Sequence, residues 1–118
     1  MSEEHTGHCL CGAVRYRASA EPVATSRCHC RSCLLATSAA TIAWVVFPAA
    51  AFAFTAGAPA RYASSPGVER TFCARCGTAL TWRRDALPDT IDATTATLDA
   101  PDAFPPSREI WLDHRIAW

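Results

Sequence analysis

Three amino acids are absent from this sequence. None of the 118 residues is Lys, Asn or Gln, so all eleven basic residues are Arg. Eleven acidic residues balance them, the formal net charge is zero, and no basic run occurs. A protein dedicated to nucleic-acid binding usually carries a basic surplus on one face. We therefore expect no nucleic-acid partner.

Long apolar segments are scarce as well. The most apolar window, residues 41–56, is short for a membrane-spanning helix and contains Pro48. Residues 1–8 are polar and acidic and lack the basic and then apolar order of a secretory signal peptide. We expect no membrane partner and a cytoplasmic location, where thiols stay reduced and available to metal.

No cysteine lies outside three short clusters. A disulfide framework spreads an even number of cysteines along a small secreted domain, whereas C-x-C and C-x-x-C spacings let neighbouring thiolates bind one metal ion. This chain has seven cysteines, an odd number, and the pattern predicts metal-thiolate chemistry. The clusters are Cys9-Leu10-Cys11, Cys28-His29-Cys30-Arg31-Ser32-Cys33 and Cys73-Ala74-Arg75-Cys76.

Seven thiolates divide naturally into a set of four and a set of three. Structural zinc takes four protein ligands, whereas catalytic zinc takes three and keeps one coordination position for water or substrate. The first and last clusters are distant in sequence but can meet when their strands pair. The predicted four-thiolate set is Cys9, Cys11, Cys73 and Cys76, and the predicted three-thiolate set is Cys28, Cys30 and Cys33.

Each set leaves an alternative open. A redox centre is the alternative for Cys73 and Cys76, but it would lie at the strand-to-helix junction of a βαβ unit, which the sequence does not indicate. The fourth ligand of the middle set could be water, His29, a carboxylate or a substrate. For both sets, the spacing of the cysteines favours a role as metal ligands over a role as buried, inert thiols.

Short strands dominate the expected secondary structure. Val14, Tyr16 and Ala18 alternate with Arg15 and Arg17, as in a strand that is buried on one face. The only helix that we expect covers residues 32–40, and a proline-rich loop covers 101–106. The other predicted strands are 41–47, a run through Phe52 and Phe54, 68–72, 80–83, 90–98 and 109–112. We expect residues 1–118 to form a single all-β domain with mostly antiparallel strands.

The motifs resemble those of the glutathione-dependent formaldehyde-activating enzyme family, which centromere protein V shares. The resemblance runs from Gly7 to Trp118 and is carried by GHCLCGAVRY at 7–16, CHCRSC at 28–33 and YASSPGVERTFCARCGT at 62–78. It implies an Mss4-like fold of stacked sheets braced by zinc. It also implies two zinc ions, a structural one on the four-thiolate set and a catalytic one on the three-thiolate set.

The resemblance also implies an activity. The family's namesake reaction adds glutathione to formaldehyde to give S-hydroxymethylglutathione, and it is classed as a carbon–sulfur lyase in the reverse direction. We therefore expect an enzyme whose partners are a small-molecule thiol and an aldehyde. Many members carry basic residues and then a glycine after the middle cluster, where this chain has LLATS at 34–38, so we expect a more apolar wall.

Several side chains near the clusters are candidates for roles in this reaction. His29 lies between two ligands and could relay a proton to the developing alkoxide, or it could be a loop residue that faces solvent. Arg27, Arg31 and Arg61 could pair with the carboxylates of a glutathione-like ligand, or each could be a solvated surface residue. Four tryptophans could form walls of the pocket, namely Trp44, Trp82, Trp111 and Trp118. Trp44 and Trp82 could instead be core residues.

Two other functions remain open at this point. One is a non-enzymatic zinc module with a structural or chromatin-associated role. Basic tails would favour this role, and this neutral chain does not carry them. The other keeps the zinc-bound thiol chemistry but uses a different electrophile or a different thiol. A fold or a metal site does not by itself determine a substrate.

Overall fold

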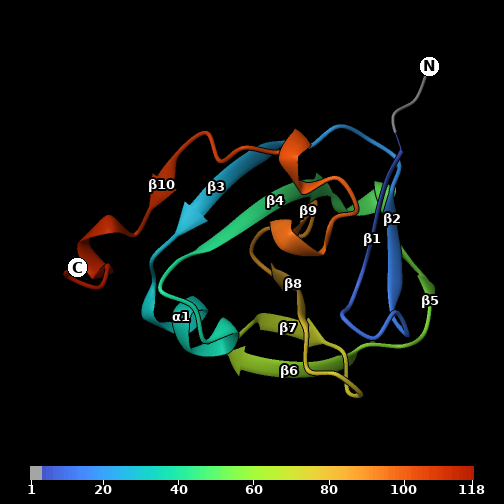
Figure 1. The fold of residues 1–118 in the computed structure, drawn as a ribbon, viewed down its shortest axis with the longest axis horizontal. Helices are drawn as coiled ribbons and strands as arrows, with labels where there is room; N and C mark the ends of the chain where they lie inside the picture. The colour runs from blue at the N-terminus through green and yellow to red at the C-terminus, as the bar shows by residue number, and fades with distance from the viewer. Residues whose placement is uncertain (1–3) are drawn as a thin grey trace.

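The computed structural model describes residues 4–118 and places their strands in two sheets (Figure 1). Residues 1–3, part of the segment for which we predict no export signal, lie outside the described residues. The smaller sheet has the antiparallel order β1-β2-β5. Its strands are β1 (His5–His8), β2 (Arg15–Ala18) and β5 (Phe52–Ala56).

The larger sheet has seven strands in the order β10-β3-β4-β9-β8-β7-β6. Every neighbouring pair is antiparallel except β10 and β3, which are parallel. In chain order its strands are β3 (Ala24–Cys28), β4 (Ile42–Pro48), β6 (Ala60–Ser65), β7 (Val68–Phe72), β8 (Ala79–Arg84), β9 (Thr90–Thr94) and β10 (Glu109–Ile110). The prediction of an all-β, mostly antiparallel fold is confirmed.

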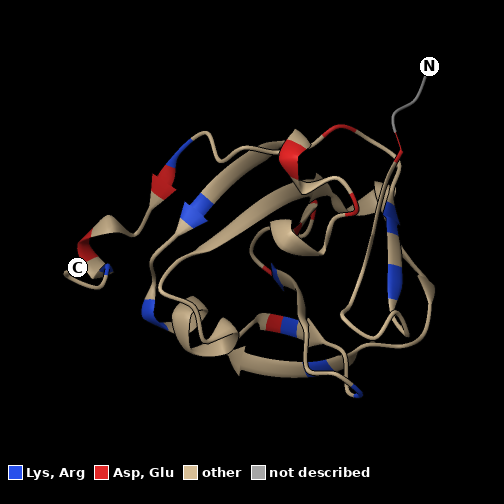
Figure 2. Cartoon of the chain, in the orientation of Figure 1, with Lys and Arg blue, Asp and Glu red and all other residues tan. Residues whose placement is uncertain are grey.

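A single α-helix occurs among residues 4–118, and it is short. Helix α1 (Arg31–Thr37) begins at Cys30, whose sulfur accepts the N–H of Cys33, and it ends at Ser38, which has a left-handed φ of 55°. The predicted helix is therefore confirmed but shorter than 32–40. Within this described part no helix is long and apolar enough to cross a membrane. Acidic and basic residues are interspersed along the chain (Figure 2).

The buried side chains form two clusters, and each cluster contains the buried cysteines of one predicted site. The larger cluster includes Cys9 and Cys73 and is built around Tyr16 and Phe47, which are almost fully buried. The Tyr16 hydroxyl lies 2.7 Å from Thr97 Oγ1, so its polar end is satisfied inside the core. The smaller cluster consists of Cys28, Cys33 and Trp44, with partly buried side chains around them.

Five predicted strands are confirmed, namely those at 14–18, 41–47, Phe52 with Phe54, 68–72 and 80–83. The remaining two predictions are correct only in their first part. The strand expected over 90–98 ends at Thr94, and Thr95–Thr97 form a 3-10 turn. Thr97 Oγ1 donates to the Thr94 carbonyl at 2.8 Å, a side-chain bond that favours a turn over a strand.

The strand expected over 109–112 ends at Ile110. Trp111 has a φ of 60°, which interrupts an extended strand, and Leu112–His114 form another 3-10 turn. The predicted loop at 101–106 begins with a 3-10 turn at Pro101–Ala103. Strands β1, β3 and β6 were not predicted, because they contain few large apolar residues and form by pairing with neighbouring strands.

Candidate metal centres and the adjoining cavity

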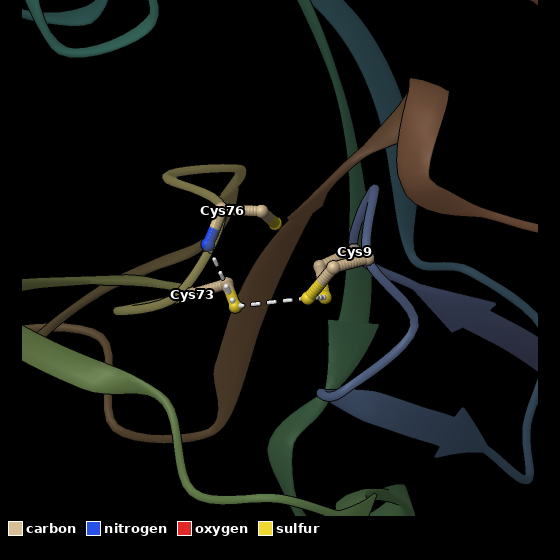
Figure 3. Close-up of side chains that lie close together, drawn as sticks. Cys9, Cys73 and Cys76 are labelled. Atoms are coloured by element: carbon tan, nitrogen blue, oxygen red, sulfur yellow. Dashed lines mark hydrogen bonds between the residues drawn. The ribbon is translucent and has the colours of Figure 1, made fainter.

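Two turns from different sheets bring four sulfur atoms together. Cys9 and Cys11 lie in the turn between β1 and β2, and Cys73 and Cys76 lie in the turn between β7 and β8. All four sulfur atoms lie within 4.8 Å of one another. Figure 3 shows the sulfurs of Cys9, Cys73 and Cys76 pointing toward a common centre. The first and last clusters therefore meet, although not by the predicted pairing of their strands, because β1 and β2 lie in one sheet and β7 and β8 in the other.

The distances between these sulfurs test whether the set fits zinc. Four sulfurs held about 2.3 Å from one ion at tetrahedral corners lie about 3.8 Å apart. Cys9 Sγ and Cys11 Sγ are 3.6 Å apart, and Cys11 Sγ and Cys73 Sγ are 3.8 Å apart. A disulfide would require about 2.05 Å, and all the cysteines are free. The donor set fits a four-coordinate zinc ion.

Backbone amides in both turns point at these sulfurs. The N–H of Val14 donates to Cys9 Sγ at 3.3 Å, and that of Cys76 donates to Cys73 Sγ at 3.4 Å. Such bonds favour the thiolate, which is the form that binds metal. The hydroxyl and backbone of Thr78, together with the backbone of Cys11, lower the pKa of the Cys76 thiol to about 5.

The three-sulfur set lies where β3 leads into α1. Cys28 ends the strand, Cys30 caps the helix and Cys33 lies in its first turn, so a continuous stretch of chain places all three. Their sulfurs lie within 4.8 Å of one another, and no other Cys, His or carboxylate atom of the described residues joins the set. Cys30 Sγ accepts the N–H of Cys33 at 3.4 Å. A set of three thiolates fits the ligand count of a catalytic zinc.

A cavity of about 120 Å³ opens beside this set. Its walls are mainly aromatic and aliphatic, and its only charged side chains besides the cysteines are Arg70 and Asp92. Arg70 Nη2 lies 3.6 Å from Cys33 Sγ, and its Nε donates to Ser64 Oγ at 3.1 Å. The lining residues are Cys28, Cys30, Cys33, Trp44, Arg70, Trp82, Asp92, Ile110 and Trp111.

A larger cavity of about 420 Å³ adjoins the first and shares Trp44 and Arg70 with it. Tyr62 and Phe72 also line it, and so do Ala36 and Thr37 of the LLATS stretch. Leu34 is buried and Leu35 is largely exposed, and neither leucine lines this cavity. The departure from the usual pattern after the middle cluster therefore changes one wall of the larger cavity through Ala36 and Thr37.

The structure places the predicted arginines and histidine away from the smaller cavity. Glu109 of β10 binds two of them: His29 Nε2 lies 2.6 Å from one carboxylate oxygen, and Arg27 Nη2 lies 2.6 Å from the other. Arg27 and His29 hold the pKa of Glu109 at about 2. Arg31 is exposed at the start of α1, and Arg61 pairs with Glu69 at 3.0 Å. None of these four side chains lines the cavity beside the three sulfurs.

Two charged residues that line the smaller cavity were not identified as site residues from the sequence. Arg70 lies on β7 and Asp92 lies on β9. Burial raises the pKa of Asp92 to about 7, although the charge of Arg108 opposes this. The available signal was an aspartate between Ile91 and Ala93 in an apolar strand, where aspartate is disfavoured.

Three of the four candidate tryptophans, Trp44, Trp82 and Trp111, line this cavity. Trp44 is also buried, so it serves both the core and the cavity wall. Trp118 is 90% exposed and lies outside the wall.

Known proteins resemble this chain in sequence and in fold. A family model described as glutathione-dependent formaldehyde-activating enzyme matches residues 4–114. An uncharacterized lyase of Schizosaccharomyces pombe is 36% identical over 84 residues, which cover 65% of this chain and 56% of that protein. The chain thus spans little more than half the length of that relative.

A putative glutathione-dependent formaldehyde-activating enzyme of Halomonas elongata is 30% identical over 122 residues, covering 95% of this chain and 77% of that protein. The crystal structure of a Rhodobacter sphaeroides protein superposes with a TM-score of 0.71 at 20% identity, covering 88% of this chain and 98% of the other. This likeness supports the fold.

Proposed function

Because the chain belongs to the glutathione-dependent formaldehyde-activating enzyme family, we propose that it adds a glutathione-like thiol to formaldehyde or another small aldehyde. The reverse reaction would make it a carbon–sulfur lyase. The observation that carries the proposal is the set of three sulfurs, Cys28, Cys30 and Cys33, beside a small cavity with largely apolar walls. The names of the relatives, a lyase and a formaldehyde-activating enzyme, agree with it.

Two zinc ions with different roles are part of the proposal. The four-sulfur set would hold a structural ion that joins the turns of the two sheets. The three-sulfur set would hold a second ion, which when bound supplies a Lewis acid that lowers the pKa of an incoming thiol. A cytoplasmic location is also proposed, because these cysteines are free and metal binding requires them reduced.

The residues around the three sulfurs would bind and orient the reactants. Arg70 places a positive charge 3.6 Å from Cys33 Sγ and so offsets part of the negative charge of three thiolates. Trp44 and Trp82 form apolar walls that exclude water and hold the thiol and the aldehyde close together. Water occupies about 30 Å³ per molecule, so the cavity of about 120 Å³ accepts formaldehyde and the reacting end of a thiol.

The rest of a glutathione-like thiol needs more room than this cavity offers. We propose that it extends into the adjoining cavity of about 420 Å³, which shares the lining residues Trp44 and Arg70 with the first. Arg31 is exposed at the start of α1 and is the proposed partner for a carboxylate of the thiol. Arg27 and Arg61 would have to exchange their ion pairs with Glu109 and Glu69 to take the same role.

The proposed reaction can be tested by exchange spectroscopy. The uncatalysed addition of a thiol to formaldehyde is quick, so NMR exchange rates at equilibrium are more informative than an end-point assay. Zinc-loaded protein should accelerate exchange between glutathione, formaldehyde and their adduct, and Cys30→Ser should abolish the acceleration. Wild-type protein with two zinc ions that accelerates neither this exchange nor that of a bulkier aldehyde would contradict the proposal.

A further inference from the structure

The wall of the smaller cavity contains one carboxyl group, that of Asp92. Asp92 lies on β9 between Ile91 and Ala93, which are 5% and 0% exposed. Its side chain lines the same cavity as the three sulfurs. Across residues 4–118, none of the side-chain hydrogen bonds or ion pairs involves its carboxylate, and its own exposure is intermediate.

Strand register places this carboxyl group opposite the cation of the site. Arg70 of β7 pairs with Trp82 of β8, and Trp82 pairs with Asp92 of β9, so the three side chains form one row on one face of the sheet. Adjacent strands lie about 4.8 Å apart, so the backbones of Arg70 and Asp92 are separated by about 10 Å. Trp82 lies between the two charges, and all three residues line the cavity.

No side-chain hydrogen bond or ion pair of the described residues compensates for the partial burial of Asp92, and only the charge of Arg108 opposes its effect. Aspartate is disfavoured inside a strand, and a carboxyl group that leaves water without a hydrogen bond destabilises the folded protein. The charged groups that face the cavity are Arg70 and the cysteines, and Arg108 acts from outside it. Burial nevertheless dominates and raises the pKa of Asp92 to about 7. A group that titrates near neutrality both accepts and donates a proton readily.

We infer that Asp92 is the general acid–base of the proposed reaction, an inference that rests on the function proposed above. Its carboxylate takes the proton as the S–H bond of the incoming thiol breaks. The sulfur then forms a bond to the aldehyde carbon, and the electron pair of the C=O π bond moves to the oxygen. That oxygen takes the proton from the Asp92 carboxyl group. Nothing is oxidised or reduced, and the carboxylate is regenerated.

The position of His29 supports this assignment. His29 is the residue that the sequence suggested for proton relay, but its Nε2 is held 2.6 Å from Glu109 and its side chain does not line the cavity. Asp92 is in the cavity wall and has no competing partner among the hydrogen bonds and ion pairs of the described chain. A general acid–base must reach the proton that it transfers, so Asp92 is the better placed of the two.

The test compares Asp92→Asn with Asp89→Asn, a matched control at an exposed aspartate just before the same strand. Exchange rates among glutathione, formaldehyde and their adduct are measured by NMR from pH 5 to 9 with zinc-loaded protein. General acid–base groups contribute about 10²- to 10⁴-fold, so Asp92→Asn should slow the catalysed exchange by at least about a hundredfold and remove a pH dependence centred near 7. Asp89→Asn should behave as wild type.

A second readout does not depend on activity or on the variant's folding. The ¹³C carboxyl resonance of Asp92 in wild-type protein should titrate near pH 7, well above exposed aspartates, which titrate near 4. A normal midpoint for Asp92, or an Asp92→Asn variant with the wild-type rate and pH profile, would overturn the inference and leave the proposed function standing. Wild-type protein without any acceleration would overturn both.

Discussion

The two cysteine sets should differ sharply in what they contribute to stability. Cys73→Ser and Cys30→Ser make the same chemical change at matched positions, because each cysteine opens a C-x-x-C pair and accepts the N–H of the residue three positions later at 3.4 Å. The sets differ in what they join. Cys11 and Cys73 are 62 residues apart and connect turns of different sheets, whereas Cys28 and Cys33 belong to one short stretch of chain.

The size of the difference follows from the loops that each set closes. In the chain-entropy model, a cross-link over about 62 residues stabilises the folded state by about 4 kcal/mol, and one over about 5 residues by about 2 kcal/mol. Zinc binding adds to this at the four-sulfur set, since structural thiolate sites bind zinc with about 10–16 kcal/mol and typical domains are stable by only about 5–15 kcal/mol. Loss of the four-sulfur site should therefore abolish soluble folding or lower the Tm by more than about 15 °C.

The assay is thermal unfolding together with zinc content by mass spectrometry under non-denaturing conditions. Wild type should carry two zinc ions, and Cys30→Ser should remain folded with one. Cys73→Ser should be insoluble or strongly destabilised. Equal collapse of the two variants, or equal tolerance of both, would refute the division into a structural and a reactive site.

Three further predictions concern single side chains. Arg70→Met removes the cation that lies 3.6 Å from Cys33 Sγ, and it should weaken thiol binding about tenfold in an NMR titration. The control is Arg84→Met, at an exposed arginine at the end of β8, which should bind the thiol as wild type does. Equal affinities of the two variants would contradict the role of Arg70. Gly7→Ala places a Cβ 2.6 Å from the Thr97 carbonyl oxygen, so it should cost about 1–3 kcal/mol in urea unfolding, and an unchanged midpoint would contradict this packing. Asp92 retains its proton in the folded state up to about pH 7 but loses it near 3.8 when unfolded, so folding stability should fall as pH rises between these values. Asp92→Asn lacks this dependence, and its stability relative to wild type should rise from pH 4 to 7 and then level off; a constant difference would contradict the raised pKa.

Sequence patterns predict the parts of this fold that depend on local burial. Tyr16 and Ala18 are buried while Arg15 and Arg17 are exposed, as their alternation indicates. The division of the cysteines is also predictable, because C-x-C and C-x-x-C spacings already place neighbouring sulfurs together. Strand β3, with the sequence ATSRC, has no comparable pattern. It forms because β4 and β10 pair with it on either side.

The meeting of the charged residues in one cavity could not be predicted for a related reason. Arg70, Trp82 and Asp92 become neighbours only through the register of three strands, and a shift of one residue in any pair would turn a side chain to the other face. His29 and Arg27 are adjacent to the cysteines in sequence, which made them candidates. The parallel pairing of β10 with β3 brings Glu109 beside them and gives both side chains a partner on the protein.

The most direct test of the account is X-ray absorption at the zinc edge during a titration with glutathione. Seven cysteine sulfurs shared between two zinc ions give an average of about 3.5 sulfurs per ion at about 2.3 Å. This average should rise to about 4 as one external sulfur enters the three-thiolate site, and Cys30→Ser should show no such saturable rise. An unchanged sulfur count in wild-type protein at saturating thiol, or a count of four before any thiol is added, would contradict it.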